Sequence, residues 1–364
     1  MAVKQGGKDV MAMSYYGKEG NPLWEQYSTR VVAHTLKSYS SHTFDYPYPT
    51  AISVEGSNGM EYPMICFNYG RPDADGTYSD AIKYGMISVI IHEVGHNYFP
   101  MIVNSDERQW TWMDEGLNTF MQFMAEQEWD RNYPSRRGPA HKIVPYMKSE
   151  KHLLEPIMTN SENIIQFGPN AYAKPATALN ILRETVMGRD LFDFAFQEYS
   201  RRWMFKHPTP DDLFRTLEDA SAVDLDWFWR GWFYGTEPVD ISIENVAWYK
   251  LDNRTPAQKK ADAKADFDRE EASVSKEANV KGVPATVVEA DPATRDFYNS
   301  YNPFSVTPED EAAYKTFLGS LSEQEKNLLN SNRNFYEMTF RNIGGLVMPL
   351  IVEFHYADGS KETE

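Results

Sequence analysis

One stretch of the chain constrains its fold more than any other. Residues 79–99 have helical spacing and apolar side chains on most sides, and they include His92-Glu93-Val94-Gly95-His96. Such a helix belongs in the middle of a domain. Two histidines four residues apart lie one turn above each other, so both imidazoles can reach one metal ion. Ionisable groups are costly to bury unless something pairs with them. The stretch therefore predicts a metal-binding helix; the alternative is a pair of histidines held by hydrogen bonds in the core.

A third metal ligand is expected from the next helix, predicted over residues 112–129. Glu115 follows His96 after 18 intervening residues, which is enough chain to leave one helix and return on another. Two histidines and one glutamate leave a tetrahedral position open for water, as in catalytic zinc sites. Glu93, beside His92 on the helix surface, can point at that water instead of the metal.

This spacing resembles the signature of the gluzincin metallopeptidases of the aminopeptidase N family, which also includes the leukotriene hydrolases. The resemblance implies one zinc ion (Zn2+) per chain, held by His92, His96 and Glu115, with Glu93 as the general base. It also implies a thermolysin-like zinc peptidase catalytic domain of the α+β class, a small sheet followed by a helical half. The resemblance spans about residues 20–240.

Residues 58–62, Asn-Gly-Met-Glu-Tyr, resemble the exopeptidase motif G-x-M-E-N of the same family. The resemblance makes Glu61 the anchor of the substrate's free α-amine, with Gly59 and Met60 in the same substrate-binding segment. A carboxylate beside the metal is a sensible partner for an ammonium group. Asn58 and Tyr62 depart from the family pattern and put the fit of the first substrate residue in question.

Residues 171–176, Ala-Tyr-Ala-Lys-Pro-Ala, resemble the family's Y-x-K-G segment. The resemblance gives the hydroxyl of Tyr172 the role of stabilising the oxyanion during catalysis. Pro175 stands where the family usually has glycine, so the local backbone is expected to differ.

The remaining pattern of the first 240 residues predicts a mixed fold. Thr209 is expected to cap a helix that begins at Pro210, and the aromatic run at 227–234 to pack in the core. The other predicted elements are a helix over 22–38 capped by Asn21, strands over 51–54 and 62–67 around a turn at 56–59, and helices over 171–187 and within 189–235.

Composition changes after residue 240. Residues 254–281 are rich in Lys, Asp, Glu and Ala, which is typical of a solvated linker or an exposed helix. Thr307-Pro308 and Ser322 with Glu325 are expected to open two helices. Residues 350–356 alternate as a strand, and Asp358-Gly359 signals a hairpin. We therefore expect a catalytic domain (1–240), a charged linker and helical segment (241–335), and the first strands of a truncated β-sandwich (336–364), with the remaining domains of a longer parent chain as partners.

The charge and the apolar runs exclude some partners. The net charge of -17 repels nucleic acid, and no apolar run is long enough to span a membrane. The lone Cys66 is expected to be a small core residue. The compartment is unassigned; a periplasmic or extracellular location would follow if a signal peptide has been lost by truncation.

The expected activity is zinc-dependent hydrolysis of peptide bonds, with removal of N-terminal residues from peptides that have a free N-terminus. Three alternatives share the zinc site: an endopeptidase, an epoxide-opening relative, and a non-catalytic peptide-binding fragment.

Overall fold

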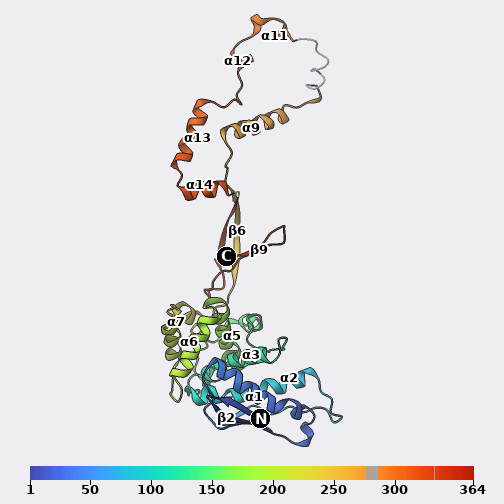
Figure 1. Cartoon of the computed structure of the whole chain (residues 1–364), viewed down its shortest axis with the longest axis vertical. Helices are drawn as coiled ribbons and strands as arrows, with labels where there is room; N and C mark the ends of the chain where they lie inside the picture. The colour runs from blue at the N-terminus through green and yellow to red at the C-terminus, as the bar shows by residue number, and fades with distance from the viewer. Residues whose placement is uncertain (276–278, 280–285, 332) are drawn as a thin grey trace. The chain divides into compact units, whose positions relative to one another are not determined.

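The computed structural model describes residues 1–275, 279, 286–331 and 333–364. These residues form two compact units, one of Met1–Ile241 with Asn342–Glu364 and one of Ser242–Arg341. The first unit contains a five-stranded sheet followed by a helical half (Figure 1), which confirms the predicted α+β class.

The sheet has the strand order β1-β2-β3-β5-β4. Strands β2, β3 and β5 run parallel, whereas β1 and β4 pair antiparallel at the two edges. Alternate residues face the core, among them Val10, Ala51 and Cys66, so the prediction for Cys66 is confirmed. The strands are β1 (Ala2–Gln5), β2 (Lys8–Tyr15), β3 (Thr50–Glu55), β4 (Met60–Tyr62) and β5 (Ile65–Asn68).

The sheet differs from the prediction in two places. Strands β1 and β2 were not expected, although Gly6 and Gly7 both have positive φ and join them as a two-residue hairpin loop, for which Gly-Gly is a known signal. The strand predicted over 62–67 is instead split into β4 and β5, because Pro63 interrupts the run and Met64 adopts a φ of 69°. A positive φ reverses the chain, so the two halves pair with each other.

Two helices cover the sheet: α1 (Leu23–His42) packs on β1, β2 and β3, and α2 (Asp80–Gly95) packs on β3, β4 and β5. The Ser79 side chain accepts a hydrogen bond from the Ile82 N–H and caps α2. The predicted cap of α1 at Asn21 is wrong, because Pro22 occupies the cap position and makes no side-chain cap bond. The chain continues from α2 into the turn η2 (Asn97–Ile102).

The helical half follows the predicted order. Thr209 and Asp212 form a reciprocal capping box with Pro210 in the first turn of α7, as expected. Its main elements are η3 (Trp112–Gly116), α3 (Leu117–Trp129), η7 (Gly168–Ala173), α5 (Lys174–Ile181), η8 (Leu182–Val186), α6 (Arg189–Arg202), α7 (Pro210–Ser221) and α8 (Asp226–Trp232). Shorter turns are η1 (Lys18–Gly20), η4 (Ala140–Lys142), α4 (Val144–Met147), η5 (Lys151–Leu153) and η6 (Ser161–Asn163).

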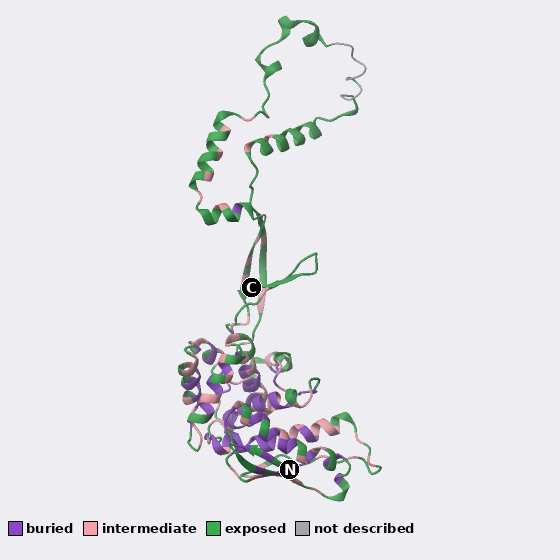
Figure 2. Ribbon diagram, viewed as in Figure 1, coloured by how far each residue is buried: buried purple, intermediate pink, exposed green. Residues whose placement is uncertain are grey.

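The buried side chains of the first unit lie between the sheet and its helices and inside the helical half (Figure 2). The aromatic run of α8 is largely core, as predicted: Phe228, Trp229, Trp232 and Phe233 are all buried. Tyr234, at the end of this run, is 49% exposed.

The second unit contains mostly exposed helices. No residue of α9 (Pro256–Glu270) is buried, which confirms the exposed character expected there. Helices α13 (Pro308–Ser320) and α14 (Glu323–Asn330) begin with capping boxes at Thr307 and Ser322, as predicted. The other elements are β6 (Ile241–Lys250), α11 (Val287–Ala290), η9 (Pro292–Thr294), α12 (Phe297–Ser300) and β7 (Asn334–Asn342).

Strands β6 and β7 form one two-stranded sheet, and β8 (Glu353–His355) and β9 (Lys361–Thr363) form another. The β8–β9 pair closes antiparallel around Asp358-Gly359 as predicted, although β8 begins at residue 353 instead of 350. A β-sandwich in this region stays a prediction. Within the described ranges, no helix combines the length and the apolar character needed to cross a bilayer.

Candidate metal centre

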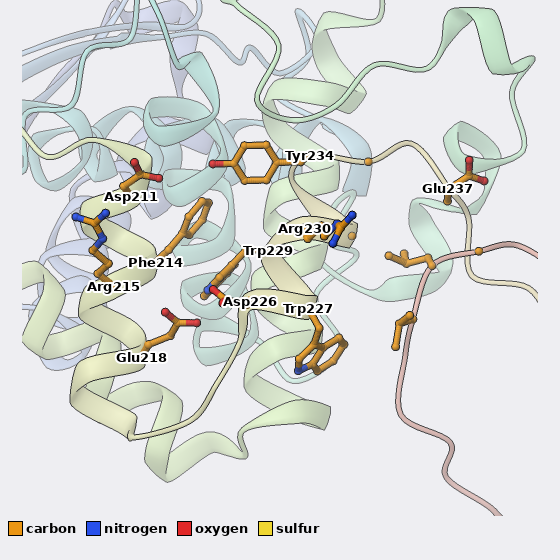
Figure 3. A pocket seen from close by; sticks show the side chains of 15 residues that line it. Asp211, Phe214, Arg215, Glu218, Asp226, Trp227, Trp229, Arg230, Tyr234 and Glu237 are labelled. Carbon is orange, nitrogen blue, oxygen red and sulfur yellow. The ribbon is translucent and has the colours of Figure 1, made fainter.

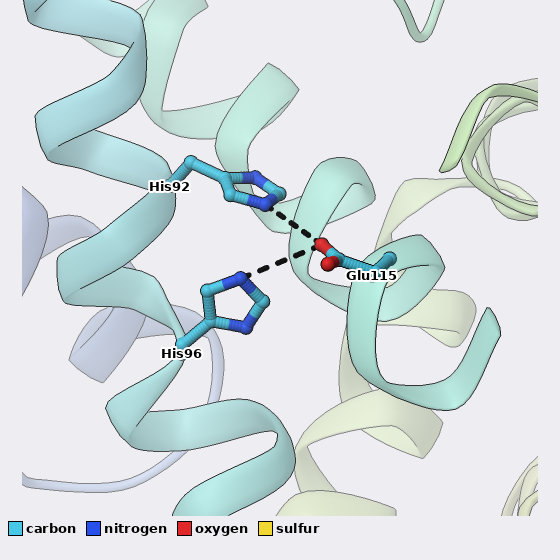
Figure 4. Close-up of side chains that lie close together, drawn as sticks. All are labelled: His92, His96 and Glu115. Atoms are coloured by element: carbon cyan, nitrogen blue, oxygen red, sulfur yellow. Dashed lines mark hydrogen bonds and ion pairs between the residues drawn. The ribbon is translucent and has the colours of Figure 1, made fainter. Parts of the chain in front are cut away.

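Three predicted ligands meet between α2 and η3 (Figure 4). Oε2 of Glu115 lies 2.9 Å from Nε2 of His92 and 3.5 Å from Nε2 of His96. One ligand atom from each residue lies within 4.8 Å of the other two. The helix spacing of four residues aligns the two imidazoles, and Glu115 reaches them from the following helical segment.

Neighbouring groups fix the orientation of both imidazoles. Nδ1 of His92 lies 2.9 Å from Oε1 of Gln122, and Nδ1 of His96 lies 3.0 Å from the carbonyl oxygen of Phe99. Both partners only accept hydrogen bonds, so each Nδ1 carries the proton. The Nε2 atoms are therefore the ones directed at Glu115, as expected of histidines that bind a metal through Nε2.

The electrostatics of the three side chains favour a cation between them. Although burial opposes it, the contacts with His92 and His96 hold the pKa of Glu115 well below its usual range. Burial and the neighbouring His96 lower the pKa of His92. Two imidazole nitrogens and an ionised carboxylate oxygen are the donors that tetrahedral zinc takes, so these residues fit the zinc ion that the sequence predicts.

The carboxylate of Asp114 lies next to the Nδ1 atom of His96. Its Oδ1 lies 2.9 Å from Nδ1 of His96. Burial lowers the pKa of His96, but Asp114 and Glu115 outweigh it and raise that pKa well above its usual value. A carboxylate behind a metal-binding histidine raises the basicity of the ligand.

Glu93 lies beside the three ligands and has an unused oxygen. It is 4% exposed, and its Oε2 is buried without a hydrogen-bond partner among the described residues. Burial raises the pKa of Glu93 to about 8. A buried polar atom without a partner is unusual in a native protein, and Glu93 is one of the residues that line the cavity at this site.

Glu61 approaches Glu93 from strand β4. Oxygens of Glu61 and Glu93 and a ring nitrogen of His96 lie within 4.8 Å of one another. Gly59 lies close by with a φ of +79°, and a Cβ there would be 3.8 Å from Oε1 of Glu93. The edge strand therefore places a second carboxylate next to the predicted metal ligands.

Tyr172 packs on the ring of His92. The two rings stack with centroids 5.8 Å apart, and the phenol is half-buried. Burial and the nearby Glu115 raise the pKa of Tyr172, which keeps its hydroxyl protonated and able to donate. Tyr172, the three predicted ligands, Glu93 and Glu61 line one cavity of about 870 Å³, a size suited to a small ligand.

Gly95 lets α2 pack closely against α1 and α3 beside this cavity. A Cβ at Gly95 would lie 2.3 Å from both Oδ1 of Asn118 and the hydroxyl of Tyr39. Tyr39 donates to Asn118, which in turn donates to the carbonyl of His92. The glycine inside His-Glu-Val-Gly-His therefore has a packing role in addition to its place in the motif.

The structure places most of the predicted site residues in one cavity. Among the described residues, its lining includes His92, His96, Glu115, Glu93, Glu61, Gly59 and Tyr172. Met60 is not among them and is 39% exposed. Of the two departures from the exopeptidase pattern, Asn58 lines the cavity and accepts a hydrogen bond from the Tyr69 N–H, whereas Tyr62 is 52% exposed.

Gln122 and Arg137 are two cavity residues that the sequence analysis did not identify. Gln122 lies seven residues after Glu115, which is two helical turns and therefore the same helix face. This spacing could have predicted that Gln122 lies beside the metal ligands. Arg137 lies in the loop after α3, whose path no local pattern sets.

A larger cavity of about 990 Å³ lies beside α7 and α8 (Figure 3). Trp227, Trp229 and Tyr234 line it, and its described lining includes no histidine. Oxygens of Glu218, Asp224 and Asp226 gather nearby, but Oε1 of Glu218 already accepts the Leu225 N–H. The histidine-containing cavity is therefore the better candidate for the functional site.

Residues 27–232 match the model of the peptidase family M1 domain. The chain is 24% identical over 290 residues to aminopeptidase A of Gloydius brevicauda and 23% identical over 250 residues to alanine/arginine aminopeptidase of Saccharomyces cerevisiae. The M1 zinc metallopeptidase of Deinococcus radiodurans, solved as a mutant, is similar in fold with a TM-score of 0.53 at 17% identity. Bound to the substrate Tyr-Ser-Ala, that mutant gives a TM-score of 0.51 at 16% identity.

The coverage of these matches is partial. The alignments include 74% and 65% of this chain but only 28% of either curated relative, and 66% of this chain but 52% of the Deinococcus protein. The match to the family model nevertheless covers more than half of the chain, and the matched residues include all three predicted ligands. This protein belongs to peptidase family M1.

Proposed function

We propose that this chain is a zinc-dependent aminopeptidase, which hydrolyses the first peptide bond of peptides with a free N-terminus. One observation carries the proposal: a single cavity contains three zinc-type donors and, next to them, the two carboxylates of Glu93 and Glu61. The three donors alone would fit any zinc hydrolase, whereas the second carboxylate adds a place for an ammonium group.

In this proposal His92, His96 and Glu115 hold one zinc ion per chain. When bound, zinc lowers the pKa of a coordinated water and polarises a substrate carbonyl. Gln122 and the carbonyl of Phe99 keep the imidazoles in the orientation that presents Nε2, and Asp114 lies beside His96. The residues of this chain thus supply the orientation and the charge that the metal site needs.

Glu93 is the proposed general base. Its orphaned Oε2 can accept a proton from the attacking water and pass it to the leaving amine, a role worth about 10²- to 10⁴-fold in rate. The hydroxyl of Tyr172 is the proposed donor to the oxyanion. Such a positioned donor is typically worth about 2.7–4 kcal/mol in the transition state.

Glu61 is the proposed anchor for the substrate's α-ammonium, with Gly59 and Met60 shaping the same edge of the cavity. The carboxylate of Glu61 is half-buried beside Glu93, where an incoming ammonium would relieve the repulsion between the two acids. This selection for a free N-terminus separates an aminopeptidase from an endopeptidase or an epoxide-opening enzyme with the same zinc site.

Further domains belong to the proposal as well. We propose that residues 1–240 form the catalytic domain, that 241–335 connect it, and that 336–364 contribute first strands to a β-sandwich. Because the chain covers 28% of its curated relatives, other parts of a longer protein are the proposed partners of this domain.

The test combines metal analysis with an aminoacyl-amide substrate panel. The chain should contain zinc and release N-terminal residues, and Glu93→Gln should keep the zinc but lose turnover by at least about 10²-fold. Glu25→Gln, an exposed site on α1, is the control and should leave turnover unchanged. Retained activity in Glu93→Gln would refute the base assignment. Zinc without hydrolysis of any peptide would favour a non-catalytic peptide-binding fragment.

A further inference from the structure

Arg137 brings a cationic group into the acidic metal cavity. Its guanidinium carbon lies 4.4 Å from the ring centroid of Tyr172, and the residue lines the cavity and is half-buried. Within the described part of the chain, this guanidinium makes no hydrogen bond and has no ion-pair partner within 4 Å. An arginine presents five N–H donors in a fixed fork, so among the described residues these donors have no protein partner.

The two acidic residues whose charges act on Arg137, Glu115 and Glu126, are already engaged. Glu115 contacts His92 and His96. Glu126 lines the same cavity, but its Oε1 accepts hydrogen bonds from Ser88 and Gln122, and its Oε2 accepts one from Ser135. Glu126 is also 3% exposed. The carboxylate of Glu126 is therefore hydrogen-bonded to groups inside the protein, and Arg137 is available to a ligand.

The cavity has acidic groups beside one predicted metal ligand and a cationic group near another. Glu61 and Glu93 cluster with His96, whereas Tyr172 stacks on His92 and Arg137 stacks on Tyr172. The exposed Arg136 lines the same cavity and adds a second positive charge. A ligand that places an ammonium at Glu61 and an anion at Arg137 would satisfy both groups.

We propose that Arg137 forms a carboxylate-binding subsite for the part of the substrate beyond the scissile bond. The inference rests on the proposed function, which puts the scissile carbonyl beside the Tyr172 hydroxyl. An extended residue spans roughly 3.3 Å, so a group that reaches Arg137 lies one or two residues past that carbonyl. The terminal carboxylate of a dipeptide or tripeptide fits this place, as does an acidic side chain at the same position.

An arginine is well suited to this ligand. Its planar fork binds a carboxylate through two parallel N–H···O bonds. Stacking on Tyr172 holds the fork in one plane and limits the conformational freedom that binding would otherwise remove.

The experiment measures kcat and KM of the zinc-loaded chain for Ala-Ala, Ala-Ala-amide and Ala-Asp-amide. Wild type should hydrolyse Ala-Ala with a kcat/KM on the order of 10- to 100-fold above that of Ala-Ala-amide, as expected for a hydrogen-bonded charged group. A similar gain with Ala-Asp-amide would assign the subsite to an acidic side chain as well; no gain would assign it to the terminal carboxylate.

The variants then locate the effect. Arg137→Ala should lower kcat/KM for Ala-Ala to the amide value and leave the amide unchanged, and Arg137→Lys should restore only part of the preference because lysine lacks the fork. The control is Arg131→Ala, an exposed arginine of the same loop that does not line the cavity. It should leave the preference unchanged.

Two results would overturn the subsite. The first is equal kcat/KM for Ala-Ala and Ala-Ala-amide in wild type, and the second is an equal loss on both substrates in Arg137→Ala, which would mean that the arginine only supports Tyr172. Hydrolysis of the amide by wild type keeps these outcomes separate from a failure of the proposed function. If no substrate is cleaved, calorimetric titration of Ala-Ala and its amide into the zinc-loaded protein still tests the subsite: tighter binding of Ala-Ala supports it, and equal binding refutes it.

Discussion

Pro175 packs directly against Gly116. A Cβ added at Gly116 would lie 2.5 Å from Cγ of Pro175 and 2.9 Å from the carbonyl oxygen of Ala171. Pro175 occupies the position where the family's Y-x-K-G segment has glycine, and the absence of a side chain at Gly116 makes room for it. The contact brings the turn that carries Tyr172 close to Glu115.

Gly116→Ala should therefore destabilise the protein. The added methyl group must displace a proline ring and a backbone carbonyl, and overpacking of this kind typically costs about 1–3 kcal/mol. Urea unfolding followed by circular dichroism measures the loss. The matched control is Gly85→Ala in α2, where an added Cβ meets nothing within 4 Å; it should be neutral or stabilise the helix by up to about 1 kcal/mol. Equal stability of Gly116→Ala and wild type would contradict the packing argument.

Gln122 is expected to set the zinc affinity without contacting the metal. Its Oε1 accepts the proton of His92 Nδ1, and its Nε2 donates to Glu126 at 2.8 Å. Gln122→Ala removes the partner that fixes the imidazole, and losses of this kind weaken metal binding by about 10- to 100-fold. Competition with a chromogenic chelator gives the affinity.

The control for this variant is Gln127→Ala, an exposed position five residues further along α3. It should bind zinc as wild type does. If Gln122→Ala also retains the wild-type affinity, His92 is held by the helix alone and the proposed role of Gln122 is wrong.

The predicted metal triad illustrates what local spacing can establish. His92 and His96 are one helical turn apart in any α-helix, so their proximity follows from the sequence alone. To bring Glu115 to the two histidines, a second helix had to be predicted to begin near residue 112. The structure confirms that boundary. The capped helices at Pro210, Pro308 and Glu323 were predictable for the same reason, because a cap is a contact between residues three apart.

Contacts between distant segments were harder to foresee. Strands β1 and β2 were missed because the first residues are polar and rich in glycine, and their pairing depends on the Gly6-Gly7 turn and on the parallel partner β3. The position of Arg137 over Tyr172 joins a loop to the helical segment η7, 35 residues further along the sequence. No periodicity encodes such a contact, since loop paths depend on the packing of the elements that they connect.

Glu61 should control the preference for a free N-terminus. Its carboxylate lies with Glu93 and His96, and the ammonium–carboxylate bond that it offers is worth roughly 10- to 100-fold in kcat/KM. Glu61→Ala should therefore lower kcat/KM for a free peptide much more than for the same peptide with an acetylated amine. Chromatographic assay of both peptides gives the ratio. An equal loss on the two substrates would remove the exopeptidase assignment.

Lys174 should make the stability of the protein depend on pH in the alkaline range. The side chain is 1% exposed, and its Nζ donates to the carbonyl of Gly235 at 2.9 Å. It has no carboxylate within 4 Å among the described residues, and burial lowers its pKa to about 8. Between pH 8 and the ordinary lysine pKa of about 10.4, the unfolded chain binds more protons than the folded one, so the free energy of unfolding should rise with pH.

Lys174→Met tests this expectation in the zinc-loaded protein. Below pH 8 both the folded and the unfolded wild type carry the charge, so the cost of burying it is fully present; it is relieved as the pH rises through 8. The free energy of unfolding of wild type, measured in urea from pH 7 to 10.5, should gain up to about 3 kcal/mol relative to Lys174→Met across this range. The exposed Lys142→Met should show no such gain. Parallel curves for wild type and Lys174→Met would mean that Lys174 keeps its ordinary protonation in the folded state.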